Sequence, residues 1–316
     1  MLRLLRRGAP ACQDDAVREG WRPPPDTVWI DLCSPTREEE LAVEAALGLD
    51  LPTLDEMEAL EPSSRLYQED GATFMTATLL AKSAEAKPTT TPVTFVLGKG
   101  VLVTLRYQTL RAFEVFGDRA PESAETSVST FLGLLDAIVE RLAEILGDAG
   151  DEVEQGSAAI FERPQAGNFR PLLTELAHAQ SVTSLTRNSL VSLARLLSFA
   201  NLASEIAHDA ECRTHLESLQ RDAQSLTEQA SYQSSHISFL LDAALGLINI
   251  EQNGIIKFFS VVAVVFLPPT LVASIYGMNF DHMPELHWLF GYPFAIVLMV
   301  ASAVLPILWF KRRGWL

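Results

Sequence analysis

The chain has 316 residues, and its 24 Lys and Arg against 40 Asp and Glu give a formal net charge of −16. This acidic balance argues against a nucleic-acid-binding protein, which would present a basic face. Cys12, Cys33 and Cys212 are far apart and form no CxxC pair, which argues against a disulfide framework or a structural zinc site. Met1–Arg7 is too short and too interrupted by arginine to hold the apolar core of a signal peptide.

The segment 1–120 predicts a small mixed α/β domain. A strand is predicted over 27–32, where Val28, Trp29 and Ile30 precede Asp31 and Leu32. Thr36 and Glu39 have the spacing of a capping box and predict the start of a helix over 36–47. A second short helix is predicted over 53–60.

Two hairpins are predicted in the second half of this domain. Asp70-Gly71 separates apolar runs over 66–69 and 73–80, and Gly98-Lys99-Gly100 separates 93–97 from 101–106. Pro88 and Pro92 predict a loop between the two hairpins.

Long helices are predicted beyond residue 120. Apolar residues recur at three- and four-residue spacing over 127–161, 168–200 and 211–253. We assign the first two helices to a helical region over 121–210 and the third to a stalk over 211–253. If the stalk continues to residue 275, its length reaches roughly 98 Å. Such a helix would transmit movement between a cytosolic domain and a membrane segment, and a plain spacer is the open alternative.

Apolar residues make up 48% of the chain although 20% of residues are charged, so the apolar residues must be concentrated in part of the sequence. They are concentrated at the C-terminus. The segments 258–275 and 288–310 contain no charged residue. Because a bilayer core of about 30 Å needs about 20 apolar helical residues, these segments predict membrane-spanning helices over 254–276 and 288–310. The alternative is two buried helices of a soluble core, which are rarely apolar on all sides over this length.

The flanking charges predict the orientation of the two spans. Lys257 lies at the start of the first span, and Lys311, Arg312 and Arg313 follow the second in a basic tail over 311–316. Positive charge favours the cytoplasmic side, so we expect both termini in the cytoplasm. These four residues are candidates for a basic ring at a cytoplasmic mouth, with lipid headgroup contact as the alternative role.

The loop over 277–287 is therefore expected outside. It has no Lys or Arg and carries Asp281 and Glu285, which would raise the local cation concentration or simply keep the loop soluble.

The first span has one face of small and polar residues. Steps of three and four keep residues on one side of a helix. We call the following set the polar stripe: Asn253, Ile256, Ser260, Ala263, Leu267, Thr270, Ser274 and Gly277. One interpretation is a packing face for a partner helix. The other is the wall of a pore built by several copies, with Ile256 and Leu267 as apolar constrictions that gate by dewetting. Pro268-Pro269 frees backbone carbonyls that need protein or water partners.

The outer end of the span carries Gly277-Met278-Asn279, and here the chain closely resembles the bacterial CorA magnesium transporters. The matching segments are INIEQN (248–253), IIK (255–257), VVFLPPTLVASIYGMNF (264–280), MPEL (283–286), FGYP (290–293) and KRRGWL (311–316). The resemblance is near identity over the C-terminal segment 248–316 and covers the remainder in layout only.

The resemblance implies a fold, a function and a site. The fold is an α+β cytosolic domain with long stalk helices and two C-terminal transmembrane helices, assembled as a homopentamer in the bacterial inner membrane. The function is channel-like influx of Mg²⁺, and also of Co²⁺ and Ni²⁺, without an enzymatic activity or a cofactor. The outer selectivity ring would be Gly277, Met278 and Asn279, and family pore positions fall on Asn253, Ile256, Leu267 and Thr270, where Ile256 replaces a methionine of relatives.

The resemblance also implies that cytosolic Mg²⁺ closes the pore, although the residues that would bind it cannot be assigned. Candidate carboxylates are Glu69, Asp70, Asp148, Asp151, Glu152 and Asp222. Influx needs no other energy source, because a divalent ion gains about 4.6 kcal/mol per 100 mV of inside-negative potential.

Two alternative functions remain open at this point. A zinc transporter of the same superfamily usually has Ile in place of Met278. A membrane-anchored scaffold or sensor would use the two spans only as a tether, and a tether has no need of the polar stripe.

Overall fold

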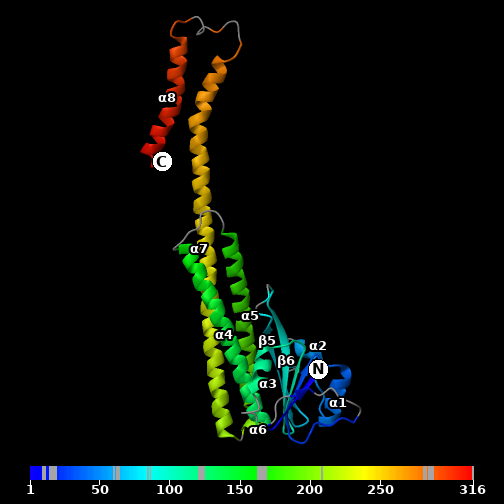
Figure 1. The fold of residues 1–316 in the computed structure, drawn as a ribbon. Coiled ribbons are helices and arrows are strands. Elements are labelled where there is room, and N and C mark those ends of the chain that lie inside the picture. The colour runs from blue at the N-terminus through cyan, green and yellow to red at the C-terminus, as the bar shows by residue number, and fades with distance from the viewer. Residues whose placement is uncertain are drawn as a thin grey trace. The chain divides into compact units, whose positions relative to one another are not determined.

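The computed structural model describes residues 1–8, 12–13, 20–59, 61, 65–83, 85, 87–119, 125–161, 169–207, 209–279, 283 and 288–314. It divides into two compact units, Met1–Leu241 and Asp242–Leu316 (Figure 1). The helix α7 (Ala210–Tyr276) contributes to both units, and α8 (Gly291–Arg312) belongs to the second.

The first unit contains a seven-stranded sheet in the order β2-β1-β3-β7-β6-β5-β4. Only the central pair β3–β7 is parallel, and the other neighbours pair antiparallel. The strands are β1 (Leu2–Arg6), β2 (Cys12–Gln13), β3 (Thr27–Cys33), β4 (Leu66–Glu69), β5 (Ala72–Ala81), β6 (Thr89–Gly98) and β7 (Val101–Arg106). The predicted strand over 27–32 and both predicted hairpins are confirmed.

The prediction of a loop at Pro92 was wrong, because Pro92 lies inside β6 opposite Thr78 of β5. The pairing of β6 with β7 begins only at Val93, opposite Arg106. Proline therefore occupies a position where β6 has a neighbour on one side only, and its missing N–H costs no ladder hydrogen bond there.

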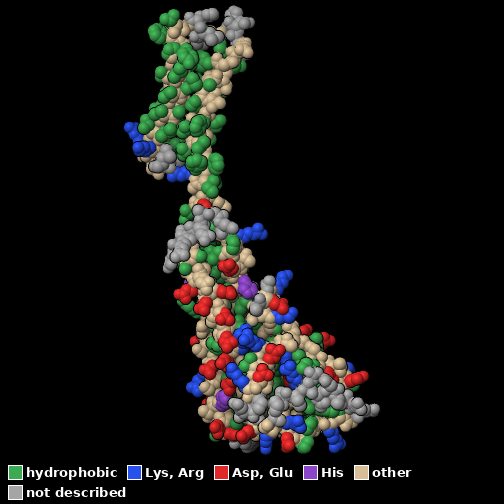
Figure 2. All heavy atoms as spheres, in the orientation of Figure 1, with side chains coloured by type: hydrophobic (Ala, Val, Ile, Leu, Met, Phe, Trp, Pro, Cys, Tyr) green, Lys and Arg blue, Asp and Glu red, His purple; other side chains and the backbone are tan. Residues whose placement is uncertain are grey.

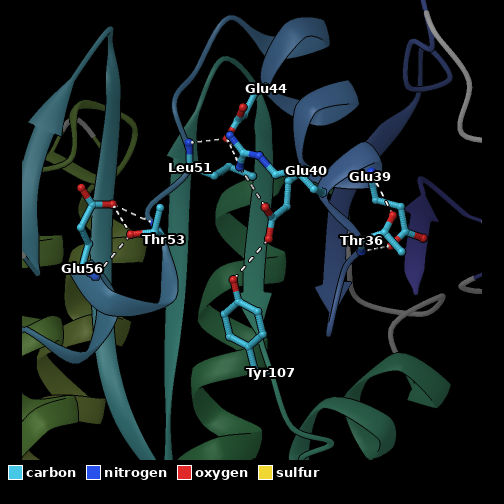
Figure 3. A network of polar contacts seen from close by, with 9 residues as sticks. Thr36, Glu39, Glu40, Glu44, Leu51, Thr53, Glu56 and Tyr107 are labelled. Atoms are coloured by element: carbon cyan, nitrogen blue, oxygen red, sulfur yellow. Dashed lines mark hydrogen bonds and ion pairs between the residues drawn. The ribbon is translucent and has the colours of Figure 1, made fainter.

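Two short helices cover one face of the sheet, α1 (Arg37–Leu47) and α2 (Leu54–Glu58). Each begins with a complete capping box, Thr36 with Glu39 and Thr53 with Glu56 (Figure 3). The helix predicted over 53–60 is shorter, because Thr53 is its cap and the helix ends at Glu58; Leu60 lies outside the described residues.

Side chains of α1 connect this layer to the end of β7. The Tyr107 hydroxyl donates to Glu40 Oε1 at 3.2 Å (Figure 3). Burial, and then the negative charge of Glu40, raise the pKa of Tyr107 to about 12. The Leu51 N–H donates to Glu44 Oε1 at 3.3 Å, which holds the chain after α1.

A buried ion pair links the two central strands. Arg106 Nε and Nη2 donate to the two carboxylate oxygens of Asp31 at 3.0 and 2.8 Å, and both side chains are 2% exposed. Thr104 donates to Asp31 Oδ1 at 2.9 Å, and Trp29 Nε1 donates to Thr104 at 2.9 Å. The guanidinium carbon of Arg106 lies 4.7 Å from the ring centre of Phe113. The pair thus has the additional hydrogen bonds that a desolvated salt bridge requires.

Helices cover the other face of the sheet and form the larger core of the first unit. They are α3 (Arg111–Arg119), α4 (Ser127–Phe161), α5 (Arg170–Ala200), the one-turn α6 (Ser204–Ala207) and the first part of α7. The predicted helix over 127–161 is confirmed at both ends. The second begins at Arg170, because Pro171 occupies the first turn, where its missing N–H is tolerated. The stalk prediction of a continuous helix into the first span is confirmed by α7.

Candidate ion pathway

The helices α7 and α8 are the two described helices that are long and apolar enough to cross a membrane. Within the second unit they pack side by side (Figure 1). Figure 2 shows many hydrophobic side chains along both helices over this length. The two predicted spans therefore correspond to the C-terminal part of α7 and to α8.

The packing between them uses one side of each helix. On α8, small and apolar residues at three- and four-residue spacing are buried or half-buried: Gly291, Ala295, Met299, Ser302, Pro306 and Phe310. On α7, the half-buried residues of the span are Val261, Val262, Val265, Pro268, Pro269, Val272 and Tyr276. Sequence reasoning did not identify this contact face, although the four-residue spacing of Gly291 and Ala295 is a signal for close helix packing.

The polar stripe lies on the opposite side of α7. At about 100° per residue, the centre of the stripe is roughly 180° around the helix from the centre of the half-buried set. All eight stripe residues, Asn253 to Gly277, are exposed in the single chain. The structure thus places every predicted pore-lining residue on a face of α7 that α8 leaves open.

The two bulky residues of the stripe, which could narrow a passage by size, are both uncovered. Ile256 is 63% exposed and Leu267 is 66% exposed. Thr270 follows Leu267 on the stripe, and its hydroxyl donates to the Phe266 carbonyl at 2.7 Å. Because the hydroxyl proton is donated to this carbonyl, the Thr270 oxygen remains able to accept a hydrogen bond from a group on the stripe side.

Proline alters the helix beside this point. Pro268 and Pro269 have no N–H to donate to the carbonyls of Val264 and Val265, four residues earlier. These carbonyls lie at the depth of Leu267 and need partners inside a membrane.

The candidate selectivity residues lie where α7 ends. The Gly277 N–H donates to the Ala273 carbonyl at 2.9 Å, and the Met278 N–H donates to the Ile275 carbonyl at 3.3 Å. A Cβ atom at position 277 would lie 3.1 Å from the Ala273 carbonyl oxygen, which is a close contact with backbone. Glycine therefore allows the chain to leave the helix tightly, and Met278 and Asn279 follow as exposed residues.

The remaining site predictions meet the structure in different ways. Asp281 and Glu285 lie outside the described residues. Lys257, Lys311, Arg312 and Arg313 are all exposed. Among the described residues, no three His, Cys, Asp or Glu side chains come together as a metal site, so the candidate carboxylates for cytosolic Mg²⁺ are not grouped within one chain.

A mixed α/β unit, long helices and two C-terminal membrane-crossing helices define a two-span membrane protein. The family model described as CorA-like Mg2+ transporter protein matches residues 25–312. The chain therefore belongs to the CorA-like Mg²⁺ transporter family, which is a family of transporters and not of enzymes.

Individual relatives agree with this assignment. The magnesium transport protein CorA of Escherichia coli K12 is 38% identical over 294 residues, which cover 92% of each chain. The protein of the same name from Salmonella typhimurium is 37% identical over the same shares. The complete structure of the CorA magnesium transporter from Methanocaldococcus jannaschii superposes with a TM-score of 0.77 at 19% identity, covering 100% of this chain and 99% of that one.

Proposed function

We propose that the chain assembles as a homopentamer in the bacterial inner membrane and conducts Mg²⁺, together with Co²⁺ and Ni²⁺, into the cytoplasm. The observation that carries the proposal is the exposed polar stripe on the side of α7 opposite α8. Two helices per chain cannot enclose a passage, so a pore requires several copies with their stripes facing one axis. Family membership and the similarity to named magnesium transport proteins support Mg²⁺ as the ion.

The selectivity step falls to Asn279, supported by Gly277 and Met278. Mg²⁺ gives up its water molecules reluctantly. A neutral amide oxygen accepts hydrogen bonds from those waters without removing them, and five such oxygens would select a hydrated ion by size and geometry. A ring of carboxylates would hold a divalent ion more tightly, whereas conduction requires binding weak enough for release. In this proposal Asp281 and Glu285 raise the local cation concentration outside that ring.

Along the pathway, Ser260, Ala263, Thr270 and Ser274 present small or hydroxyl side chains to a hydrated ion, and Asn253 lies at the cytoplasmic end. Ile256 and Leu267 form the apolar constrictions of the closed state, where a narrow apolar passage excludes water and therefore ions. Cytosolic Mg²⁺ closes the pore by binding the closed state better than the open state, at sites between chains. The basic residues Lys257 and Lys311–Arg313 surround the cytoplasmic end of the pathway.

The direct test is ion entry into liposomes that contain the purified protein, with Mg²⁺, Co²⁺, Ni²⁺ and Zn²⁺ compared at equal gradients. The proposal predicts entry of the first three ions and loss of that entry in Asn279→Ala. Entry of Zn²⁺ alone would favour the zinc alternative. Absence of any entry, with correctly assembled protein, would favour a non-conducting scaffold.

The zinc alternative has weaker support. The cytoplasmic domain of ZntB from Vibrio parahaemolyticus superposes with a TM-score of 0.58 at 10% identity, which is a likeness of fold alone and does not favour zinc. Since the 38% identity is to magnesium transport proteins, Mg²⁺ is the better supported ion.

A further inference from the structure

The cytoplasmic end of the second unit carries four cations that no carboxylate side chain of the described residues balances. Lys257 comes from α7, and Lys311, Arg312 and Arg313 come from the end of α8. After Glu251 the only acidic side chains in the sequence are Asp281 and Glu285, in the loop at the other end of both helices. No ion pair among the described residues involves any of the four cations.

Counting along the helices places these cations at similar distances from the loop ends of α7 and α8. The stretch from Lys257 to the end of α7 at Tyr276 has the same length as the stretch from the start of α8 at Gly291 to Phe310. Lys257 therefore lies roughly 29 Å along α7 from its loop end, and Phe310 lies equally far along α8 from its own loop end. This distance is about the thickness of the hydrocarbon core, so the cations lie at the headgroup boundary.

Two of the four cations, Lys257 and Arg313, lie beside the face that α7 and α8 share. Lys257 is four residues before Val261, which is half-buried toward α8, so the two share one side of α7. Arg313 is three residues after the buried Phe310 and lies on the side of α8 that faces α7. Lys257 is also four residues after Asn253 and three residues before Ser260, so it borders the polar stripe as well.

The surroundings of Arg313 also suit a lipid boundary. Its guanidinium carbon lies 5.5 Å from the ring centre of Trp309, which is 54% exposed. Tryptophan is enriched at the membrane interface, and an Arg stacked on its ring keeps its donors free for an anionic phosphate. Figure 2 shows Lys and Arg side chains gathered at this end of α8, next to the hydrophobic length of the helix.

We propose that Lys257, Lys311, Arg312 and Arg313 bind the phosphate headgroups of anionic phospholipids in the cytoplasmic leaflet. Four like charges at this boundary repel one another, and the C-terminal dipole of α8 compensates only those in its last turn. A lipid phosphate held between Lys257 and Arg313 would balance the cluster and fix the end of α8 to α7. The proposal rests on the membrane insertion of the second unit and not on ion conduction.

The test measures lipid retention by native mass spectrometry of the full-length protein, released from bilayers of equal phosphatidylglycerol and phosphatidylcholine. We expect wild-type protein to retain phosphatidylglycerol preferentially. The triple variant K257Q/R312Q/R313Q should lower the ratio of retained phosphatidylglycerol to retained phosphatidylcholine by about tenfold. Each Lys or Arg near an anionic leaflet strengthens the attraction between the protein and that leaflet.

The matched control is K87Q/R111Q/R119Q, which removes three exposed cations of the first unit and produces the same net charge. It should retain the wild-type ratio, and so should the charge-preserving variant R312K/R313K. An equal ratio in wild type, an unchanged ratio in K257Q/R312Q/R313Q, or displacement of the lipid by millimolar glycerol phosphate would each overturn the proposal. Because lipid retention is read without ion flux, a protein that fails to conduct Mg²⁺ could still pass this test.

Discussion

Replacement of Leu267 by alanine tests the apolar constriction in the pathway. The change removes three carbon atoms from each chain, or about 2.4 kcal/mol of apolar transfer free energy at about 0.8 kcal/mol per carbon. In a pentamer the sum is about 12 kcal/mol around the ring. If only about one eighth of this sum enters the barrier to wetting, the barrier falls by about 1.5 kcal/mol, and basal Mg²⁺ entry rises about 13-fold.

The matched control is Leu305→Ala. Leu305 lies on α8 and is 65% exposed, against 66% for Leu267, so the same chemical change is made at the same exposure but away from the stripe. The assay is Mg²⁺ entry into liposomes that enclose a Mg²⁺-sensitive dye and enough Mg²⁺ to populate the ion-bound closed state, with a higher Mg²⁺ concentration outside. Equal entry in wild type, Leu267→Ala and Leu305→Ala would refute the assignment of Leu267 to a constriction.

Other substitutions test separate parts of the structure. Asn279→Ala should abolish Mg²⁺ uptake while the assembly keeps its wild-type size in gel filtration, and normal flux from correctly assembled protein would remove the selectivity role of this amide. Asp31→Ala leaves Arg106 charged and buried, so the free energy of unfolding should fall by about 3–5 kcal/mol in denaturant titration; a loss below about 1 kcal/mol would contradict the buried pair. Because the pKa of Tyr107 is raised by burial and by Glu40 to about 12, the proton is bound more tightly in the folded chain. The stabilising contribution is therefore complete below about pH 10 and lost between about pH 10 and 12, and Tyr107→Phe should make thermal stability less sensitive to pH in that window.

The sequence predicted the elements whose signals are local. Thr36 with Glu39 starts a helix through a capping box that depends on four residues, and Asp70-Gly71 makes a turn that depends on two. The long helices and both spans follow from periodicity and apolar length, which are likewise properties of continuous segments.

Features that depend on distant residues were missed. The strand β1 was considered only as a possible leader segment, yet Leu2–Arg6 pairs with β3 and buries Leu2, Leu4 and Leu5. The bidentate pair of Asp31 and Arg106 requires β3 and β7 to be parallel neighbours, although its two members are 75 positions apart in the sequence. Nothing local in either segment indicates that they meet.

For the candidate pathway, the sequence predicted which residues share a face, and the structure adds what lies opposite. A three- and four-residue spacing identifies the stripe from Asn253 to Gly277, but it cannot say whether α8 covers it. The half-buried set on the other side of α7 answers that question for a single chain. In the proposed assembly, the equivalent stripes of the other copies would complete the site.

The number of chains in the assembly tests the central claim most directly, because stripes on separate chains can enclose a pathway only around a common axis. Native mass spectrometry of the purified protein should give five times the 34.7 kDa of one chain. A mass that corresponds to one or two chains would contradict a pore lined by the polar stripe.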